Sequence, residues 1–139
     1  MIISFEIPIL PISGQLVIRG ANNNMFRSPT VQDYKMVMRL YVMEHYPNFV
    51  PRTKCVQIAE LTFAFPYLKK HFEKNGTFKE EFQQQLDLFG VIPHQNTPDL
   101  ENMEKPLYDS FTGYIWKDDK QIWNKNVQKI HTDRAYIKA

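Results

Sequence analysis

Pro106 restricts the local structure of the acidic middle of this chain more than any other residue. Inside a helix that began eight residues earlier, it would remove one backbone hydrogen bond and clash with the preceding turn, at a cost of about 3 kcal/mol. We therefore predict that Pro98–Glu101 is extended and that Asn102 caps a helix over Met103–Thr112. Gly113 would end this helix, because glycine readily adopts the left-handed conformation found at helix ends.

The acids around this helix have the order and spacing of a site for a hard cation. Alternate side chains of an extended segment point the same way, so Asp99 and Glu101 would share one side. Lys105 follows one turn into the helix, and Asp118 and Asp119 return just before the next strand. Carboxylates that converge from two segments supply the oxygen ligands that Mg²⁺ prefers. The alternative is that these acids are separate and lie in solvated loops.

The ordered set resembles the motif of the RusA family of Holliday-junction resolvases. Those proteins carry Asp-x-Asp-Asn-x-x-Lys-x-x-x-Asp, then a bulky aromatic stretch, then Asp-Asp-x-Gln-Val. At the corresponding places this chain has Asp99-Leu100-Glu101-Asn102, Lys105, Asp109-Ser110-Phe111 and Trp116-Lys117-Asp118-Asp119-Lys120-Gln121-Ile122. Segments 2–8 and 56–66 look like the first and third strands of the family. The resemblance spans most of the chain and is specific between Pro98 and Ile122.

The resemblance implies an endodeoxyribonuclease that binds branched DNA and resolves a four-way junction by symmetric paired nicks, in recombination and repair. It implies an α+β fold, RusA-like, that forms a homodimer with one acidic site in each subunit. Phosphodiester hydrolysis at this site would use one or two Mg²⁺ ions in each subunit. The implied metal ligands are Asp99, Glu101 and Asp119, and the implied catalytic residues are the same three together with Lys105.

Two further acids have secondary roles in this interpretation. Lys105 and Asp109 lie four residues apart on one helix face, so we expect Asp109 to hold Lys105 in an ion pair. Asp118 would point away from Asp119, because side chains alternate along an extended segment.

Glu101 is where the chain departs from the family, which usually has aspartate at this position. The extra methylene moves the carboxylate outward, and catalytic groups tolerate misplacement poorly. One alternative function is therefore a catalytically impaired RusA-like protein that binds DNA junctions. Another is an interaction protein that uses the helix predicted over Thr77–Phe89, which would bind neither junctions nor metal.

Basic residues in several segments are candidate DNA contacts. Arg19 and Arg27 flank a polar loop, residues 20–24, that would approach DNA in relatives. The alternative for residues 20–24 is a plain surface loop. Lys35 and Arg39 lie four residues apart on one face of the predicted helix, and the alternative to a phosphate contact there is a solvated face. The full set of candidate DNA contacts is Arg19, Arg27, Lys35, Lys69 and Lys70.

Apolar periodicity predicts a small mixed sheet of four or five strands, with helices against it, in a single domain over residues 1–139. A capping box and an apolar stripe indicate a helix over Val31–His45. A second box, Thr77 with Glu80, begins the helix that Gly90 ends. The predicted strands are Ile2–Ile7, Gln15–Arg19, Val56–Phe65, Gln121–His131 and Ala135–Lys138, with a turn over Pro11–Gly14 joining the first two.

Composition excludes several classes of function. The net charge of the 139 residues is only +2, so composition alone does not indicate nucleic-acid binding. Cys55 cannot form an internal disulfide, which suits a reducing cytoplasm, and we expect it to be buried. The four histidines are scattered and expected to be surface or loop residues, and no zinc, Walker or Ser/His/Asp pattern is present. No apolar run is long enough for a membrane span. We expect the cytoplasm of a bacterial host, with a phage or prophage origin.

Overall fold

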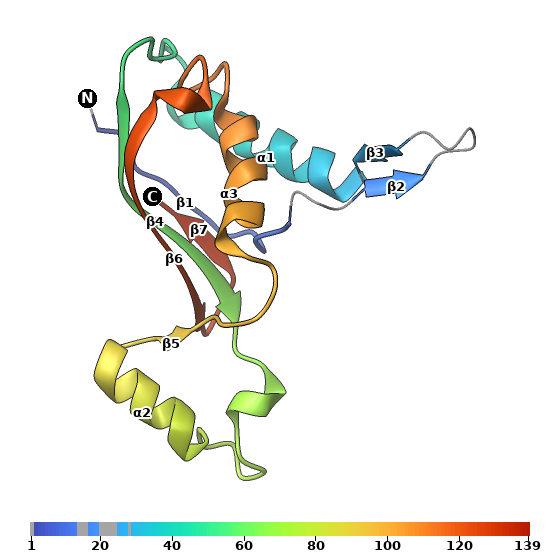
Figure 1. Cartoon of the computed structure of the whole chain (residues 1–139), viewed down its shortest axis with the longest axis vertical. Coiled ribbons are helices and arrows are strands. Elements are labelled where there is room, and N and C mark those ends of the chain that lie inside the picture. The colour runs from blue at the N-terminus through green and yellow to red at the C-terminus, as the bar shows by residue number, and fades with distance from the viewer. Residues whose placement is uncertain (1, 14–16, 20–24, 28) are drawn as a thin grey trace. The chain divides into compact units, whose positions relative to one another are not determined.

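The computed structural model describes residues 2–13, 17–19, 25–27 and 29–139. These residues form a five-stranded sheet, a two-stranded sheet and three α-helices (Figure 1), so the predicted α+β class is confirmed. The elements are, in chain order, β1 (Glu6–Ile7), β2 (Val17–Arg19), β3 (Met25–Arg27), α1 (Pro29–His45), β4 (Val56–Pro66), the 3₁₀ turn η1 (Lys69–His71), α2 (Glu80–Phe89), β5 (Ile92–Pro93), α3 (Leu100–Phe111), the 3₁₀ turn η2 (Asp119–Gln121), β6 (Ile122–Thr132) and β7 (Tyr136–Lys138).

The chain divides into two compact units. One unit, which we call the sheet unit, contains β1, α2, β5 and β7. The other, the helix unit, contains β2, β3, α1 and α3, and the strands β4 and β6 each have residues in both units. The sheet unit consists of Met1–Pro11, Glu60–Thr97 and Asn126–Ala139, and the helix unit consists of Ile12–Ala59 and Pro98–Lys125.

The five strands lie in the order β1-β7-β4-β6-β5. β7 pairs antiparallel with β1 and with β4, so that Ile137 lies between Ile7 and Phe63. β5 pairs antiparallel with β6, whereas β4 and β6 run in the same direction (Figure 1), and the sheet is mixed as predicted. The apolar core of the sheet unit includes Phe5, Ile7, Leu61, Phe63, Ala64, Ile92, Ile130 and Ile137.

The first amino-terminal strand is shorter than predicted, and the two amino-terminal strands belong to different sheets. β1 has two residues, because it pairs with the end of β7, which itself has three. β2 pairs with β3 instead, in a register that places Arg19 opposite Met25 and Arg27 opposite Val17. The predicted polar loop between β2 and β3, and residues 14–16 of the predicted turn and strand, lie outside the described residues.

The helices α1 and α2 differ from their predicted bounds at their amino ends. α1 begins at Pro29, and α2 begins at Glu80. Thr77 does not cap α2, because its backbone N–H and its hydroxyl both donate to Oδ1 of Asn75, at 3.1 and 2.7 Å. Gly90 ends α2 as predicted, with a φ of 76°. No helix in the described part of the chain is long and apolar enough to cross a membrane.

α3 begins at Leu100 and contains Pro106 in its interior, so the predicted extended segment and the Asn102 cap are wrong. Asp99 is the N-cap instead, while Gly113, with a φ of 87°, follows the helix end as predicted. The proline removes one helical hydrogen bond, but burial of one large apolar side chain stabilises a fold by about 1.5–3 kcal/mol. Burial therefore outweighs the proline. The buried residues of α3 are Met103, Glu104, Pro106, Leu107, Tyr108, Ser110 and Phe111.

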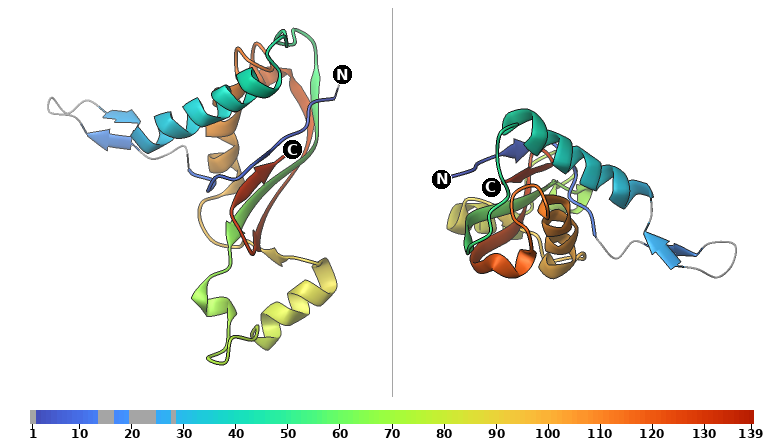
Figure 2. Two further views of the ribbon diagram at one scale, coloured as in Figure 1. Left: turned by 180° about the vertical axis from the view of Figure 1, so that it is seen from behind. Right: turned by 90° about the horizontal axis from the view of Figure 1, so that it is seen from above.

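In the helix unit, α1 and α3 lie against each other (Figures 1 and 2). α1 contributes most of its predicted apolar stripe to the interior of the unit, with Tyr41 only half-buried. The buried members of the stripe are Val31, Tyr34, Met38 and Val42.

Three of the four histidines are buried together in the sheet unit. The prediction of surface or loop positions is therefore wrong for His131, which lies in β6, while His94 does lie in a loop. The centroid of the His131 ring lies 4.5 Å from that of His71 and 4.6 Å from that of His94. The three side chains come from β6, from η1 and from the residue after β5. Because these segments are far apart in sequence, the spacing of the histidines did not indicate the cluster. His45, in α1, is exposed as predicted.

Cys55 is exposed, so the prediction that it is a buried apolar residue is wrong. It precedes the first residue of β4 and therefore does not take part in the strand. Its thiol is accessible in the folded chain.

Candidate active site

The predicted site residues of α3 lie at its exposed beginning. The carbonyl of Asp99 accepts the backbone N–H of Met103 at 3.2 Å, whereas its carboxylate makes no capping hydrogen bond. Glu101 lies in the first turn and Lys105 one turn later, and all three site residues are exposed. The amino end of a helix carries partial positive charge, which favours acids there. This part of α3 therefore presents two carboxylates and one ammonium group to solvent.

Gln121 holds the turn that carries the two neighbouring aspartates. Its Oε1 accepts the backbone N–H groups of Lys117 and Asp118, at 3.0 and 2.8 Å. Its Nε2 donates to the carbonyl oxygens of Arg52 and Lys54, at 2.9 and 2.6 Å. Only a side-chain amide offers both a carbonyl acceptor and an N–H₂ donor. These contacts give a physical reason for the glutamine in the Asp-Asp-x-Gln motif.

The two neighbouring aspartates have different surroundings. Asp118 is the N-cap of η2, and its carboxylate accepts the backbone N–H of Lys120 at 3.0 Å. This hydrogen bond lowers the pKa of Asp118. Asp119 is exposed. Its charge affects Tyr108 in α3: burial raises the pKa of Tyr108, and the charges of Glu104 and Asp119 raise that pKa further. Asp119 therefore lies within electrostatic range of Tyr108 in α3. The carboxylate of Asp118 is occupied instead by the cap of η2.

Glu104 is a buried acid that was not among the site residues predicted from the sequence. It is 7% exposed, and its Oε1 accepts hydrogen bonds from the Tyr108 hydroxyl at 2.7 Å and from Nζ of Lys125 at 2.8 Å. Nζ of Lys125 also lies 5.8 Å from the centroid of the Tyr108 ring. The four-residue spacing of Glu104 and Tyr108 was a usable signal for one contact. Lys125 is 21 residues from Glu104, and no local pattern connects them.

Asp109 pairs with α1 and not with Lys105, which corrects the predicted ion pair. Nζ of Lys35 lies 3.6 Å from Oδ2 of Asp109. Arg39 donates to the backbone carbonyls of Ser110 and Asp109, at 3.1 and 3.3 Å. The carboxyl end of a helix favours cations, so these two α1 side chains hold the last turns of α3. Lys105 forms no ion pair with any described residue.

The candidate DNA contacts lie in both units. Lys35 has a side chain only 18% exposed and is engaged with α3. Lys69 and Lys70 are exposed in η1 of the sheet unit. Arg19 and Arg27 are placed by their strands, but their side chains lie outside the described part of the structure. DNA binding by these residues stays a prediction.

The donor chemistry of the candidate site fits a hard cation. Asp99, Glu101 and Asp119 offer carboxylate oxygens, the ligands that Mg²⁺ prefers. Within the described ranges, no three His, Cys, Asp or Glu side chains are grouped closely enough to hold a metal ion. Mg²⁺ is commonly bound by one or two carboxylates together with waters and substrate phosphates. The exposed acids are therefore compatible with a cation that is held jointly by protein and substrate.

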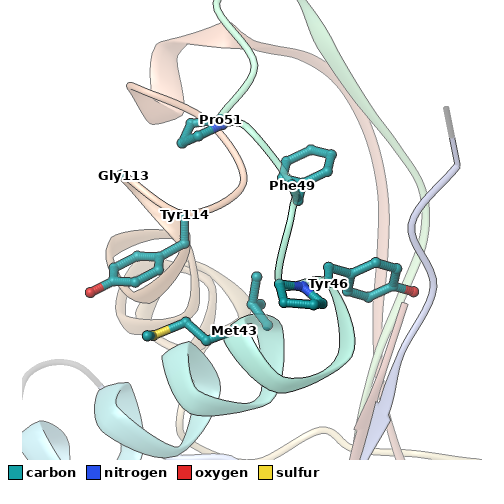
Figure 3. A pocket seen from close by; sticks show the side chains of 8 residues that line it. Met43, Tyr46, Phe49, Pro51, Gly113 and Tyr114 are labelled. Atoms are coloured by element: carbon teal, nitrogen blue, oxygen red, sulfur yellow. The ribbon is translucent and has the colours of Figure 1, made fainter.

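A pocket of about 300 Å³ lies at the carboxyl end of α1 (Figure 3). Met43, from α1, and Tyr114, from the segment after α3, are two of the side chains that line it. None of its lining residues carries a carboxylate or a cationic side chain, so this pocket offers no ligand for a hard cation. The lining residues are Val42, Met43, Tyr46, Pro47, Phe49, Pro51, Gly113 and Tyr114.

The family model of the endodeoxyribonuclease RusA matches residues 8–139, nearly the whole chain. The chain therefore belongs to the RusA family of endodeoxyribonucleases, which confirms the family predicted from the acidic motif. Membership of this family implies an endonuclease that acts on Holliday junctions. No curated protein matches the sequence.

Proposed function

We propose that this protein is a divalent-cation-dependent endodeoxyribonuclease that resolves Holliday junctions by symmetric paired nicks. The observation that carries the proposal is the family match over residues 8–139. The exposed positions of Asp99, Glu101 and Asp119 support it, because a branched DNA molecule cannot enter an enclosed pocket. RusA resolvases in general depend on a divalent metal.

The residues of the acidic motif would divide the chemistry between them. Asp99, Glu101 and Asp119 would hold one or two Mg²⁺ ions, which supply Lewis-acid stabilisation of the charge on the attacked phosphate. Lys105, exposed one turn after Glu101, would bring an ammonium group to the negative charge that develops on the phosphate, or orient the attacking water. Shape and phosphate contacts would select the junction, since such contacts position a protein without reading sequence.

We further propose that the protein acts as a homodimer. A four-way junction is roughly two-fold symmetric and must be cut on two opposed strands, which two sites related by a two-fold axis can do. Light scattering should then give twice the 16.5 kDa mass of one chain. The bacterial cytoplasm, where phage or prophage recombination takes place, is the location that suits this activity.

Glu101 favours one second candidate, a junction-binding protein with an impaired site. Its longer side chain stands where the family usually has aspartate, and it lies in the first turn of α3. Such a protein would bind the junction with the same preference for branched DNA and would leave it uncut.

The deciding experiment incubates the protein with a labelled synthetic four-way junction and with a linear duplex of the same sequence, in Mg²⁺ or in EDTA. The proposal predicts paired nicks in the junction, in Mg²⁺ only, with the duplex left intact. Equal cutting of both DNAs would remove the resolvase assignment. Junction binding without cleavage in Mg²⁺ would favour the impaired protein.

A further inference from the structure

Glu104 is charged and buried, which requires a specific compensation. A buried carboxylate costs several kcal/mol unless it is paired and hydrogen-bonded. Here one oxygen, Oε1, accepts both the Tyr108 hydroxyl at 2.7 Å and Nζ of Lys125 at 2.8 Å. The pair is therefore a short, charge-assisted contact, of the kind that fixes the position of both partners.

The two ends of this pair differ in their access to solvent. The Glu104 side chain is 9% exposed, whereas the Lys125 side chain is 49% exposed. Tyr108 restrains the lysine a second time, because Nζ lies 5.8 Å from the centroid of its ring. The Glu104 side chain is thus covered by protein, while about half of the Lys125 side chain is open to solvent, so the lysine is the end of the pair that an approaching molecule meets.

The pair adjoins the candidate site. Glu104 directly precedes Lys105 and lies three residues after Glu101 on α3, so the acids share one side of the helix. Asp119 acts electrostatically on Tyr108, which donates to Glu104. Lys125 follows Asp119 by six residues, in β6. All of these residues belong to the helix unit.

We propose that Lys125 is a binding residue for a DNA phosphodiester group, held ready by Glu104 and Tyr108. The inference rests on the proposed function and adds to it a cation that neither the acidic motif nor its spacing indicated. An ammonium group has three N–H donors, and in the described part of the chain Glu104 is its one hydrogen-bond partner. A side chain already held in one geometry loses less conformational entropy when it binds a ligand.

A purely structural ion pair makes a different prediction. In that case the loss of Lys125 would lower the stability of the fold and leave the electrostatics of DNA binding unchanged. Each phosphate contact by a lysine contributes about 0.9 to the slope of log affinity against log salt. The salt slope is therefore the measurement that separates the two roles.

The test measures binding of a labelled four-way junction in EDTA, between about 50 and 200 mM salt. For Lys125→Met we expect the salt slope to fall by about 0.9, so that the affinity lost across this range is about 3.5 times smaller than for the wild type. Lys125→Arg keeps the charge and should keep the slope. Lys138→Met removes one exposed lysine from β7 in the sheet unit and serves as the matched control, with the wild-type slope.

A second variant guards against misfolding. Lys125→Met leaves Glu104 buried without its counter-charge, so Glu104→Gln/Lys125→Met is measured beside it. The amide keeps an acceptor for the Tyr108 hydroxyl, and this folded double variant should show the same loss of slope. A folded double variant with the wild-type slope overturns the inference. If Lys138→Met lowers the slope equally, the effect is one of net charge and the inference is also overturned.

The outcomes for the wild type separate this inference from the proposed function. If the wild type cuts junctions in Mg²⁺ but the folded variants that lack Lys125 keep the wild-type salt slope, only the inference is overturned. A wild-type protein that binds no DNA overturns the proposed function, and the role of Lys125 with it.

Discussion

The side-chain amide of Gln121 donates a hydrogen bond to the carbonyl oxygen of Lys54 at 2.6 Å. This contact joins the turn before β6 to the segment before β4, within the helix unit. The same side chain accepts the N–H of Asp118 at 2.8 Å, next to Asp119. The position of Asp119 therefore depends on a residue that carries no charge and takes no part in the proposed chemistry.

Gln121→Ala should weaken both the fold and the site. It removes four hydrogen bonds, and because the residue is partly exposed, water replaces some of them. We expect the free energy of unfolding to fall by about 1–3 kcal/mol in urea titrations. Junction cleavage should fall by about 10²-fold, since a misplacement of one ångström can cost that much.

Gln121→Glu separates the two halves of this contact. The carboxylate can still accept from the turn but cannot donate to Arg52 and Lys54, so the variant should lose activity as well. Gln84→Ala, at an exposed position of α2, is the matched control and should behave as wild type. Wild-type cleavage by Gln121→Ala would show that the turn is held without this side chain.

Asp99→Asn and Asp119→Asn should each abolish most cleavage while junction binding persists. Both replace a charged oxygen ligand with a neutral group of nearly the same shape, so occupancy by the metal should fall. Removal of a negative charge near the DNA phosphates should also tighten binding in EDTA. Gel-shift and cleavage assays on the same preparations measure both effects. Asp87→Asn, in α2 of the sheet unit, is the control, and wild-type rates in both site variants would refute the assigned ligands.

Glu101→Gln tests the residue at which this chain departs from its family. The substitution keeps the length of the side chain and removes the charge. If Glu101 is a ligand, cleavage in Mg²⁺ should fall by about 10²-fold or more. If it is only a solvated acid at the beginning of α3, the rate should hardly change, and the ligand role is then refuted.

Glu101→Asp measures how the local backbone has adapted to the longer acid. A site arranged as in relatives should accept the shorter side chain with little loss of Mg²⁺-supported cleavage. A backbone that has shifted to suit glutamate would leave aspartate short of the metal, with a loss of about 10²-fold. Single-turnover cleavage rates distinguish these two results.

The histidine cluster should make the stability of the fold depend on pH. Burial lowers the pKa of His71, His94 and His131. The charge of His131 further lowers the pKa of the other two, and the charges of Lys70, Lys79 and Lys129 add to the effect. The pKa of His94 falls to about 4. The folded cluster binds fewer protons than the unfolded chain, so its contribution to stability is complete above a pH of about 6.5 and is lost as the pH falls.

His94→Phe should weaken this pH dependence. Its Nδ1 is buried and has no hydrogen-bond partner among the described residues. The centroid of its ring lies 4.4 Å from that of Phe65, so phenylalanine can take its place. Between pH 7 and pH 5, urea titrations should show the wild type losing about 2 kcal/mol more than this variant. His45→Gln, at an exposed position of α1, should titrate as wild type. Equal losses in the wild type and in His94→Phe would contradict the prediction.

Much of the fold could be predicted because it follows from patterns among neighbouring residues. β4 and β6 lie within one residue of their predicted bounds, since alternation and β-branched residues are read over a few neighbours. Gly90 and Gly113 end α2 and α3 as predicted, because the left-handed conformation depends on the residue itself. The beginning of α3 could not be predicted from Pro106, since the burial that outweighs the proline comes from residues that other segments cover.

The amino-acid sequence by itself determined the family of this protein, the class of its fold and the order of its acidic motif. These depend on residue identity and spacing, which are local quantities. Only the tertiary structure decided that Glu104 is buried against Lys125, that Asp109 pairs with Lys35, and that His71, His94 and His131 share one interior. Each of these contacts joins residues from different segments. Which distant segments meet depends on the packing of the whole unit, because no local preference selects a partner that lies tens of residues away.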